Sequence, residues 1–175
     1  MPGILHCLSG HDLSFLRAAA DLWGLTVSGK DAPTTMRALA AALAQHPDLE
    51  EVAAALPDES RLALAALQNR GGSLPWASFT RLYGELRQMG PARRAREKPH
   101  FFPQSTTERL WYRALIGRDF FRQDDELVEL AYIPDEFLAR LPVFQEDAQP
   151  ASKLEPAAQG SIERGLFWKE RVLDD

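Results

Sequence analysis

The order of helix and strand signals between residues 57 and 141 constrains the fold more than any other feature of the chain. Apolar residues recur there at helical spacing in several segments, and two later segments are typical of the strands of a hairpin. Glycine and proline separate these segments. A chain with this order is mainly α-helical, because only the hairpin and a short stub are extended. The signals predict helices over 58–70, 76–87, 106–116 and 135–141, a strand stub over 73–75, a loop over 88–104, and strands over 119–122 and 126–133.

Capping signals set the expected starts of three helices. Ser9-Gly10-His11-Asp12 and Ser105-Thr106-Thr107-Glu108 both have the form of a capping box, in which a side chain accepts a hydrogen bond from a backbone N–H of the first turn. Asp58 is the expected N-cap of the helix that follows Pro57. We therefore expect these three helices to begin at Ser9, Asp58 and Ser105.

Residues 1–56 predict a helical N-terminal subdomain with helices over 9–23, 31–45 and 49–56. An extended link joins the first two helices. The helix–link–helix order is similar to the SAP motif, a small DNA-binding unit, and the matching residues are Leu16, Gly24, Leu25, Ser28, Gly29, Lys30 and Leu39. The chain departs from that motif because Asp31-Ala-Pro-Thr34 adds length before the second helix and basic residues are sparse. A generic helical hairpin is the alternative.

The element order of residues 57–141 resembles a winged-helix domain, in which three helices pack around one core and a two-stranded wing follows. In that fold the third helix often enters the major groove of DNA. Here it would carry Arg109 and Arg113, which are four residues apart and share one face. Two features depart from the fold: 17 residues separate the second and third helices, and the expected wing tip over 123–126 is acidic. A winged-helix fold used for protein contact is the alternative.

Positive charge is concentrated in the middle of an acidic chain. The whole chain has a formal net charge of −5, yet residues 81–118 carry nine basic and three acidic side chains. Such an island is a candidate footprint for the phosphates of DNA. It also fits an arginine-rich strip that pairs with carboxylates of this chain or of a partner protein. The candidate nucleic-acid-binding residues are Arg87, Arg93, Arg94, Arg96, Lys98, Arg109, Arg113 and Arg118.

Phe101 and Phe102 lie within the same basic, proline-bounded loop. They either pack the loop onto the core or offer stacking surfaces to nucleic-acid bases. Two adjacent phenylalanines are costly to leave in water. Packing on the core is therefore the favoured expectation.

A set of short motifs also runs through the part of the chain from residue 9 to residue 142. The motifs are Leu74-Pro75-Trp76, Phe79-Thr80-Arg81, Met89-Gly90-Pro91-Ala92-Arg93-Arg94, Arg96-Glu97, Leu110-Trp111-Tyr112-Arg113, Leu115-Ile116-Gly117-Arg118 and Ala131-Tyr132-Ile133-Pro134-Asp135. As a set they resemble bacterial helicase-associated proteins, whose shared region is related to a domain that accompanies XPB-type helicases. The resemblance implies a DNA-linked context without catalytic residues. It also implies that the chain is the N-terminal part of such a protein or a stand-alone version.

The sequence lacks the common motifs of catalysis. A helicase motor needs a G-x-x-x-x-G-K-[ST] loop, and the nearest match, Gly24 to Lys30, continues with Asp31 and follows a helix. Neither G-x-S-x-G nor H-E-x-x-H occurs. We therefore expect no catalytic residue, no metal site and no cofactor, so the chain is not expected to be an enzyme.

The remaining expectations concern location, partners and the C-terminal residues. Cys7 is the only cysteine, which fits a reducing compartment, and no apolar run approaches the roughly 20 residues that cross a bilayer. We expect a cytoplasmic protein without membrane contact. Its expected partner is DNA or, in the alternative, another protein or a second copy. Residues 142–175 predict an acidic linker followed by a terminal helix or disordered tail.

Overall fold

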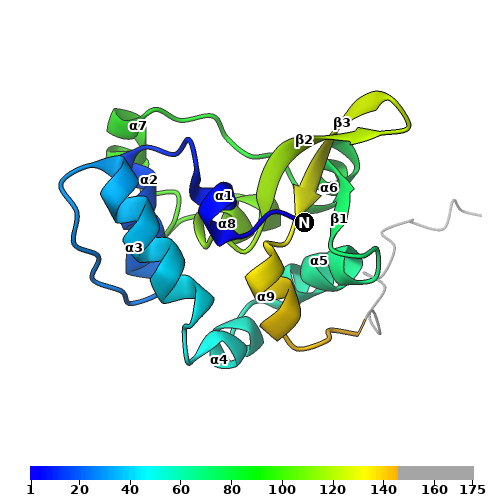
Figure 1. Ribbon diagram of the computed structural model, residues 1–175, viewed down its shortest axis with the longest axis horizontal. Coiled ribbons are helices and arrows are strands. Elements are labelled where there is room, and N and C mark those ends of the chain that lie inside the picture. The colour runs from blue at the N-terminus through cyan, green and yellow to red at the C-terminus, as the bar shows by residue number, and fades with distance from the viewer. Residues whose placement is uncertain (146–175) are drawn as a thin grey trace, which may run out of the picture.

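The computed structural model describes residues 1–145, and the terminal helix expected over 162–173 lies outside them. The described part is mainly α-helical with one small antiparallel sheet, as the sequence predicts (Figure 1). The helices are α1 (Ile4–Leu8), α2 (Leu13–Leu22), α3 (Ala32–Ala44), α4 (Leu49–Ala54), α5 (Asp58–Gln68), α6 (Trp76–Tyr83), α7 (Pro91–Glu97), α8 (Thr106–Tyr112) and α9 (Asp135–Arg140). The strands are β1 (Ser73–Pro75), β2 (Gly117–Gln123) and β3 (Glu126–Tyr132).

The sheet has the strand order β1-β3-β2. β2 and β3 form the expected hairpin, and its tip projects from the helical body (Figure 1). The turn is made by Asp124 and Asp125, which both adopt positive φ angles, of 46° and 66°. Aspartate tolerates this left-handed region better than most side chains do. The expected stub at 73–75 becomes a full member of the sheet, because Leu74 pairs with Ala131 on the free edge of β3.

Helix starts agree with the sequence in part. Ser105 caps α8, because its hydroxyl accepts a hydrogen bond from the amide of Glu108 at 3.0 Å. The expected start at Ser9 is wrong: Ser9 ends α1, and Asp12 caps α2 by accepting from the amide of Phe15 at 2.9 Å. The expected cap at Asp58 is also displaced, because Pro57 occupies the N-cap and Asp58 is already helical.

The segment expected to be a loop over 88–104 contains a helix, α7. Pro91 does not oppose it, because proline is tolerated at the first helical position, where its missing N–H would have no helical partner. Lys98 ends the helix in a left-handed conformation, with a φ of 46°. The neighbouring helices are shorter than expected. α6 stops before Gly84, whose φ is 93°, instead of reaching residue 87. α8 stops at Tyr112 instead of reaching residue 116, and Gly117 begins β2.

One continuous hydrophobic core joins the two ranges that the sequence divides at residue 56. Leu16 and Leu39 from the first range and Phe79, Tyr132 and Phe137 from the second are all buried in it. The indole N–H of Trp23 also donates to the carbonyl of Arg113 at 2.8 Å. The core therefore does not divide at the expected domain boundary.

The N-terminal residues are bound to α9. The amino group of Met1 lies 3.1 Å from the Asp135 carboxylate, and the amide of Ile4 donates to Glu136 at 2.8 Å. Within residues 1–145, no helix is both long enough and apolar enough to cross a membrane.

Candidate nucleic-acid interface

The helix expected to face DNA, α8, is enclosed by the rest of the protein. Five of its seven residues are buried: Thr106, Thr107, Glu108, Leu110 and Tyr112. Helices α2, α5 and α6 all pack against it. Arg109 is half-buried, so α8 offers little surface for insertion into a groove.

Arg113 lies just beyond the end of α8. Its guanidinium donates to the carbonyl of Arg109 at 3.1 Å instead of pointing along a free helix face. Burial, followed by the nearby Arg109 charge, lowers its pKa below the usual arginine value. The pair expected to present a common basic face is therefore partly withdrawn from solvent.

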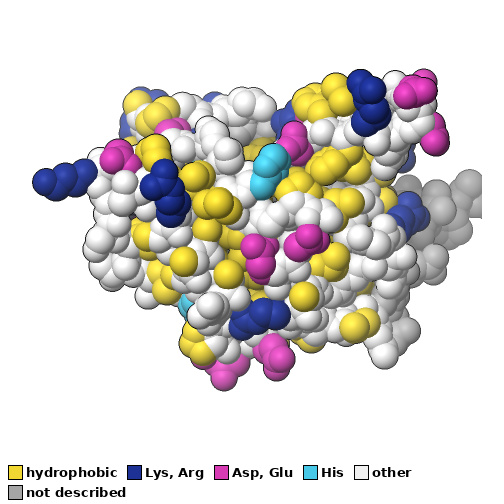
Figure 2. Space-filling view, viewed as in Figure 1, with side chains coloured by type: hydrophobic (Ala, Val, Ile, Leu, Met, Phe, Trp, Pro, Cys, Tyr) yellow, Lys and Arg dark blue, Asp and Glu magenta, His cyan; other side chains and the backbone are white. Residues whose placement is uncertain are grey.

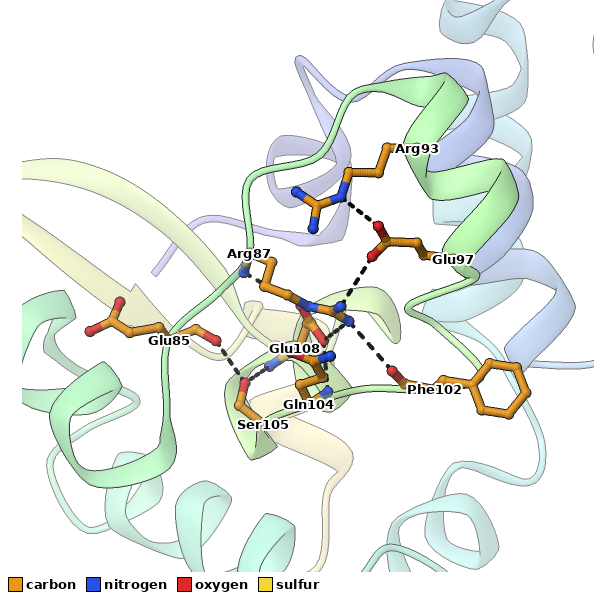
Figure 3. A network of polar contacts seen from close by, with 8 residues as sticks. All are labelled: Glu85, Arg87, Arg93, Glu97, Phe102, Gln104, Ser105 and Glu108. Carbon is orange, nitrogen blue, oxygen red and sulfur yellow. Dashed lines mark hydrogen bonds and ion pairs between the residues drawn. The ribbon is translucent and has the colours of Figure 1, made fainter.

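Arg87 is occupied by an internal ion pair with Glu108, whose side chain is fully buried (Figure 3). Nε and Nη2 of Arg87 donate to the two carboxylate oxygens at 2.7 and 2.8 Å. The amide of Gln104 donates to the same carboxylate at 2.8 Å. Burial by itself raises the pKa of Glu108, but the hydrogen bonds from Arg87 and Gln104 outweigh it, so the pKa lies below its usual value. Glu108 is therefore a buried anion that fixes the segments before and after α7.

Arg94 docks α7 onto α2. Its Nη1 donates to both carboxylate oxygens of Asp12, at 2.8 and 3.0 Å, and to the Ser14 hydroxyl at 3.1 Å. Its Nη2 donates to the carbonyl of Met89 at 3.1 Å, and its guanidinium lies 5.9 Å from the centre of the Phe15 ring. Only 11 % of the Arg94 side chain is exposed. Arg94 therefore holds the fold together at this point and offers no free charged end to a phosphate.

Two further candidate arginines also have carboxylate partners. Arg93 donates to Glu97 at 2.7 Å, four residues along α7. Arg118 donates to Glu129 across the hairpin at 2.5 Å and lies 4.8 Å from the centre of the Trp76 ring. These pairs are partly exposed, so a competing phosphate would meet less resistance here than at Arg87 or Arg94.

Three basic side chains near α7 are exposed and form no ion pair within the described residues. Arg96 and Lys98 belong to the predicted set, whereas Arg17 on α2 does not. Arg17 cannot be grouped with them from sequence alone, because the contact between α2 and α7 joins residues about 80 positions apart. The one available signal is that Arg17 is the only basic residue of α2.

The expectation that Phe101 and Phe102 pack on the core is wrong. Their exposed fractions are 53 % and 70 %. Backbone hydrogen bonds hold this turn instead: both amides donate to the carbonyl of Lys98 at 3.0 Å, and Arg87 contacts the carbonyl of Phe102 at 3.4 Å. Figure 3 shows the Phe102 ring pointing away from the network that anchors its backbone. We call Arg17, Arg96, Lys98, Phe101 and Phe102 the α7 surface.

Beside Arg94, His11 is held in its neutral form. Its ring stacks on Phe15 with 3.8 Å between ring centres and meets the edge of Trp111 at 5.3 Å. Burial first, and the Arg94 charge second, lower its pKa from 6.5 to about 4, against a smaller opposing effect of Asp12. Protonation of His11 must therefore weaken the packing between α2 and α8.

This gives a pH-dependent prediction. An unfolded chain binds a proton at His11 near pH 6.5, whereas the folded chain binds it only near pH 4, so stability is full above pH 6.5 and falls as the pH drops. We expect this residue to contribute a loss of about 2 kcal/mol between pH 7 and pH 4. Urea unfolding at a series of pH values measures it, with His11→Gln as the comparison. Parallel losses in the two proteins would refute the buried neutral imidazole.

Comparison with protein-family models, with curated proteins and with solved structures gives no significant match. The resemblance to helicase-associated proteins therefore stays an interpretation of the sequence. Within residues 1–145, no group of three or more histidine, cysteine, aspartate or glutamate side chains is arranged to hold a metal ion.

Proposed function

We propose that this chain is a non-catalytic module that contacts DNA, with a preference for single strands, through the α7 surface. The observation that carries the proposal is the combination of two exposed phenylalanines, Phe101 and Phe102, with exposed cations that have no carboxylate partner in the described residues. Single-stranded nucleic acid is commonly bound by basic grooves that track the phosphates and aromatic rings that stack on the bases.

The preference for single strands follows from the surroundings of α8. A duplex read through its major groove needs an accessible helix, and α8 is enclosed on several sides. The hairpin tip carries Asp124, Asp125 and Glu126, which repel the phosphates that a wing would approach. Unstacked bases, in contrast, can reach exposed phenylalanine rings.

We also propose that α5, α6, α8 and the β2–β3 hairpin form a winged-helix layout, with α7 inserted between the second and third helices. The order of these elements and the packing of α8 on α5 and α6 support this proposal. The insertion accounts for the long connection that departs from the usual fold. The resemblance to helicase-associated proteins implies a DNA-linked context, which is consistent with the proposed function. The same DNA-binding experiment tests both.

Fluorescence anisotropy of labelled oligonucleotides tests the proposal. We expect micromolar binding of single-stranded DNA at about 50 mM salt and a clear loss of affinity at about 200 mM, because phosphate contacts release counterions. A duplex of the same length should bind at least about tenfold more weakly, since its bases are not available for stacking. Equal affinity for both forms would contradict the single-strand preference. No binding at low salt would contradict DNA contact altogether.

A second candidate function is protein contact through the hairpin. Phe120 and Leu127 have exposed fractions of 57 % and 67 %. The register pairs Arg122 with Leu127, so Phe120 and Leu127 are diagonal neighbours on one face of the sheet. Figure 2 shows hydrophobic side chains over the hairpin, next to basic and acidic groups at its tip. Light scattering tests self-association through this surface. A wild-type dimer that becomes a monomer in Phe120→Ser and Leu127→Ser supports the surface. A monomeric wild type contradicts dimer formation through the hairpin.

A further inference from the structure

A hollow of about 270 Å³ lies between α2 and the end of α7. One wall is formed by Ser14, Arg17 and Asp21 of α2. The opposite wall is formed by Arg94 of α7 with Lys98 and His100 of the following turn. Phe101, one of the two exposed phenylalanines, also lines it, so the hollow is continuous with the α7 surface.

The hollow carries an excess of positive charge. Arg17, Arg94 and Lys98 line it, against the single carboxylate of Asp21. Arg94 is largely neutralised by Asp12, but Arg17 and Lys98 form no ion pair with any residue from 1 to 145. Two cations without an ion-pair partner therefore line a space that one acidic side chain only partly balances.

Two buried nitrogen atoms of the lining residues have no hydrogen-bond partner among the described residues. They are Nε of Arg94 and Nδ1 of His100, and both are buried. The Nε–H of arginine is always a donor, and here it has no acceptor among the described residues, although Asp12 balances the charge of the guanidinium. The Ser14 hydroxyl accepts from Arg94, which leaves its own hydrogen free for an acceptor. The hollow therefore offers donors and positive potential to a ligand that brings acceptors.

We infer that this hollow binds one phosphate group. A phosphate supplies several acceptor oxygens and the negative charge that Arg17 and Lys98 require. The volume of about 270 Å³ is large enough for a phosphate with part of a sugar. The phosphate comes either from a free nucleotide or from a DNA strand. The second source rests on the proposed function, because Phe101 would stack on the adjoining base.

Backbone NMR shifts during titration with inorganic phosphate and with thymidine 5′-monophosphate test the site, with thymidine as the neutral control. We expect saturable shifts at the amides of Ser14, Lys98 and His100 with both phosphates and none there with thymidine. The double variant Arg17→Gln, Lys98→Gln should abolish them, whereas Arg70→Gln, which removes an exposed charge just after α5 and outside the hollow, should leave them. Absent shifts, or equal losses in both variants, would overturn the inference.

A second arm uses single-stranded DNA and separates this inference from the proposed function. In the double variant, the slope of log affinity against log salt should be smaller in magnitude by about 0.7 for each lost phosphate contact. Phe101→Ala should weaken binding without changing that slope. If free phosphates saturate the hollow but DNA does not bind, the hollow stands and the proposed function fails. If the double variant binds DNA with the wild-type slope and free phosphates cause no shifts, the phosphate site in the hollow is refuted and the proposed function stands.

Discussion

Replacing Glu108 by alanine is expected to lower the free energy of unfolding by about 3–5 kcal/mol, the usual effect of removing one partner of a buried ion pair. The variant leaves Arg87 without its main acceptor and removes the acceptor of the Gln104 amide. It also leaves a cavity on the buried side of α8, where the Glu108 side chain is fully enclosed. Because this carboxylate fixes the segments on both sides of α7, the α7 surface should lose its order as well.

Glu97→Ala is the matched control. Glu97 also contacts Arg87, at 3.3 Å, but its side chain is 37 % exposed. Exposed ion pairs contribute about 0–1 kcal/mol, so this variant should unfold close to wild type. Urea denaturation followed by circular dichroism compares the three proteins. A loss below about 1 kcal/mol in Glu108→Ala would mean that the buried pair does not stabilise the fold as argued.

Replacing both Phe101 and Phe102 by alanine is expected to weaken single-stranded DNA binding by about 30-fold or more. Stacking on an aromatic ring contributes about 1–3 kcal/mol per base, and the two rings are the most exposed aromatic groups near the unpaired cations. Because both rings are exposed, the variant should keep its stability within about 0.5 kcal/mol. Anisotropy gives the affinity, and urea unfolding confirms the fold.

Phe120→Ala is the control for this variant. Its ring is exposed to a similar extent, at 57 %, but it lies on the hairpin. We expect the affinity for DNA to remain at the wild-type value. If Phe120→Ala weakens binding while the Phe101 and Phe102 double variant does not, the binding surface is the hairpin and the α7 surface is wrongly assigned.

Local signals in the sequence predicted much of the fold. The hairpin follows from two segments with strand spacing around Gln123-Asp124-Asp125, and the start of α8 follows from its capping box. In both, neighbouring residues decide the structure, so tertiary contacts need not be known. The predicted start of α2 is wrong because the sequence offers two capping residues, Ser9 and Asp12, within one turn. Ser9 ends α1, so Asp12 caps α2.

The candidate site was harder to predict because its chemistry depends on distant pairs. The basic cluster was visible in the sequence, but Arg94 meets Asp12 from 82 residues away and Arg87 meets Glu108 from 21 away. The spacing of residues along the sequence does not indicate such distant pairs. The same reason hides Arg17, which joins the cluster only when α2 and α7 pack. The exposure of the two phenylalanines does not follow from their apolar character, because backbone hydrogen bonds anchor their turn without burying the rings.

Mapping the amide NMR shifts caused by an oligothymidine of about ten nucleotides tests the central claim most directly. The account predicts saturable shifts over residues 95–102 and at Arg17, with little change in the hairpin. Shifts confined to residues 118–129, or no shifts at about millimolar oligonucleotide, would contradict a single-strand contact at the α7 surface.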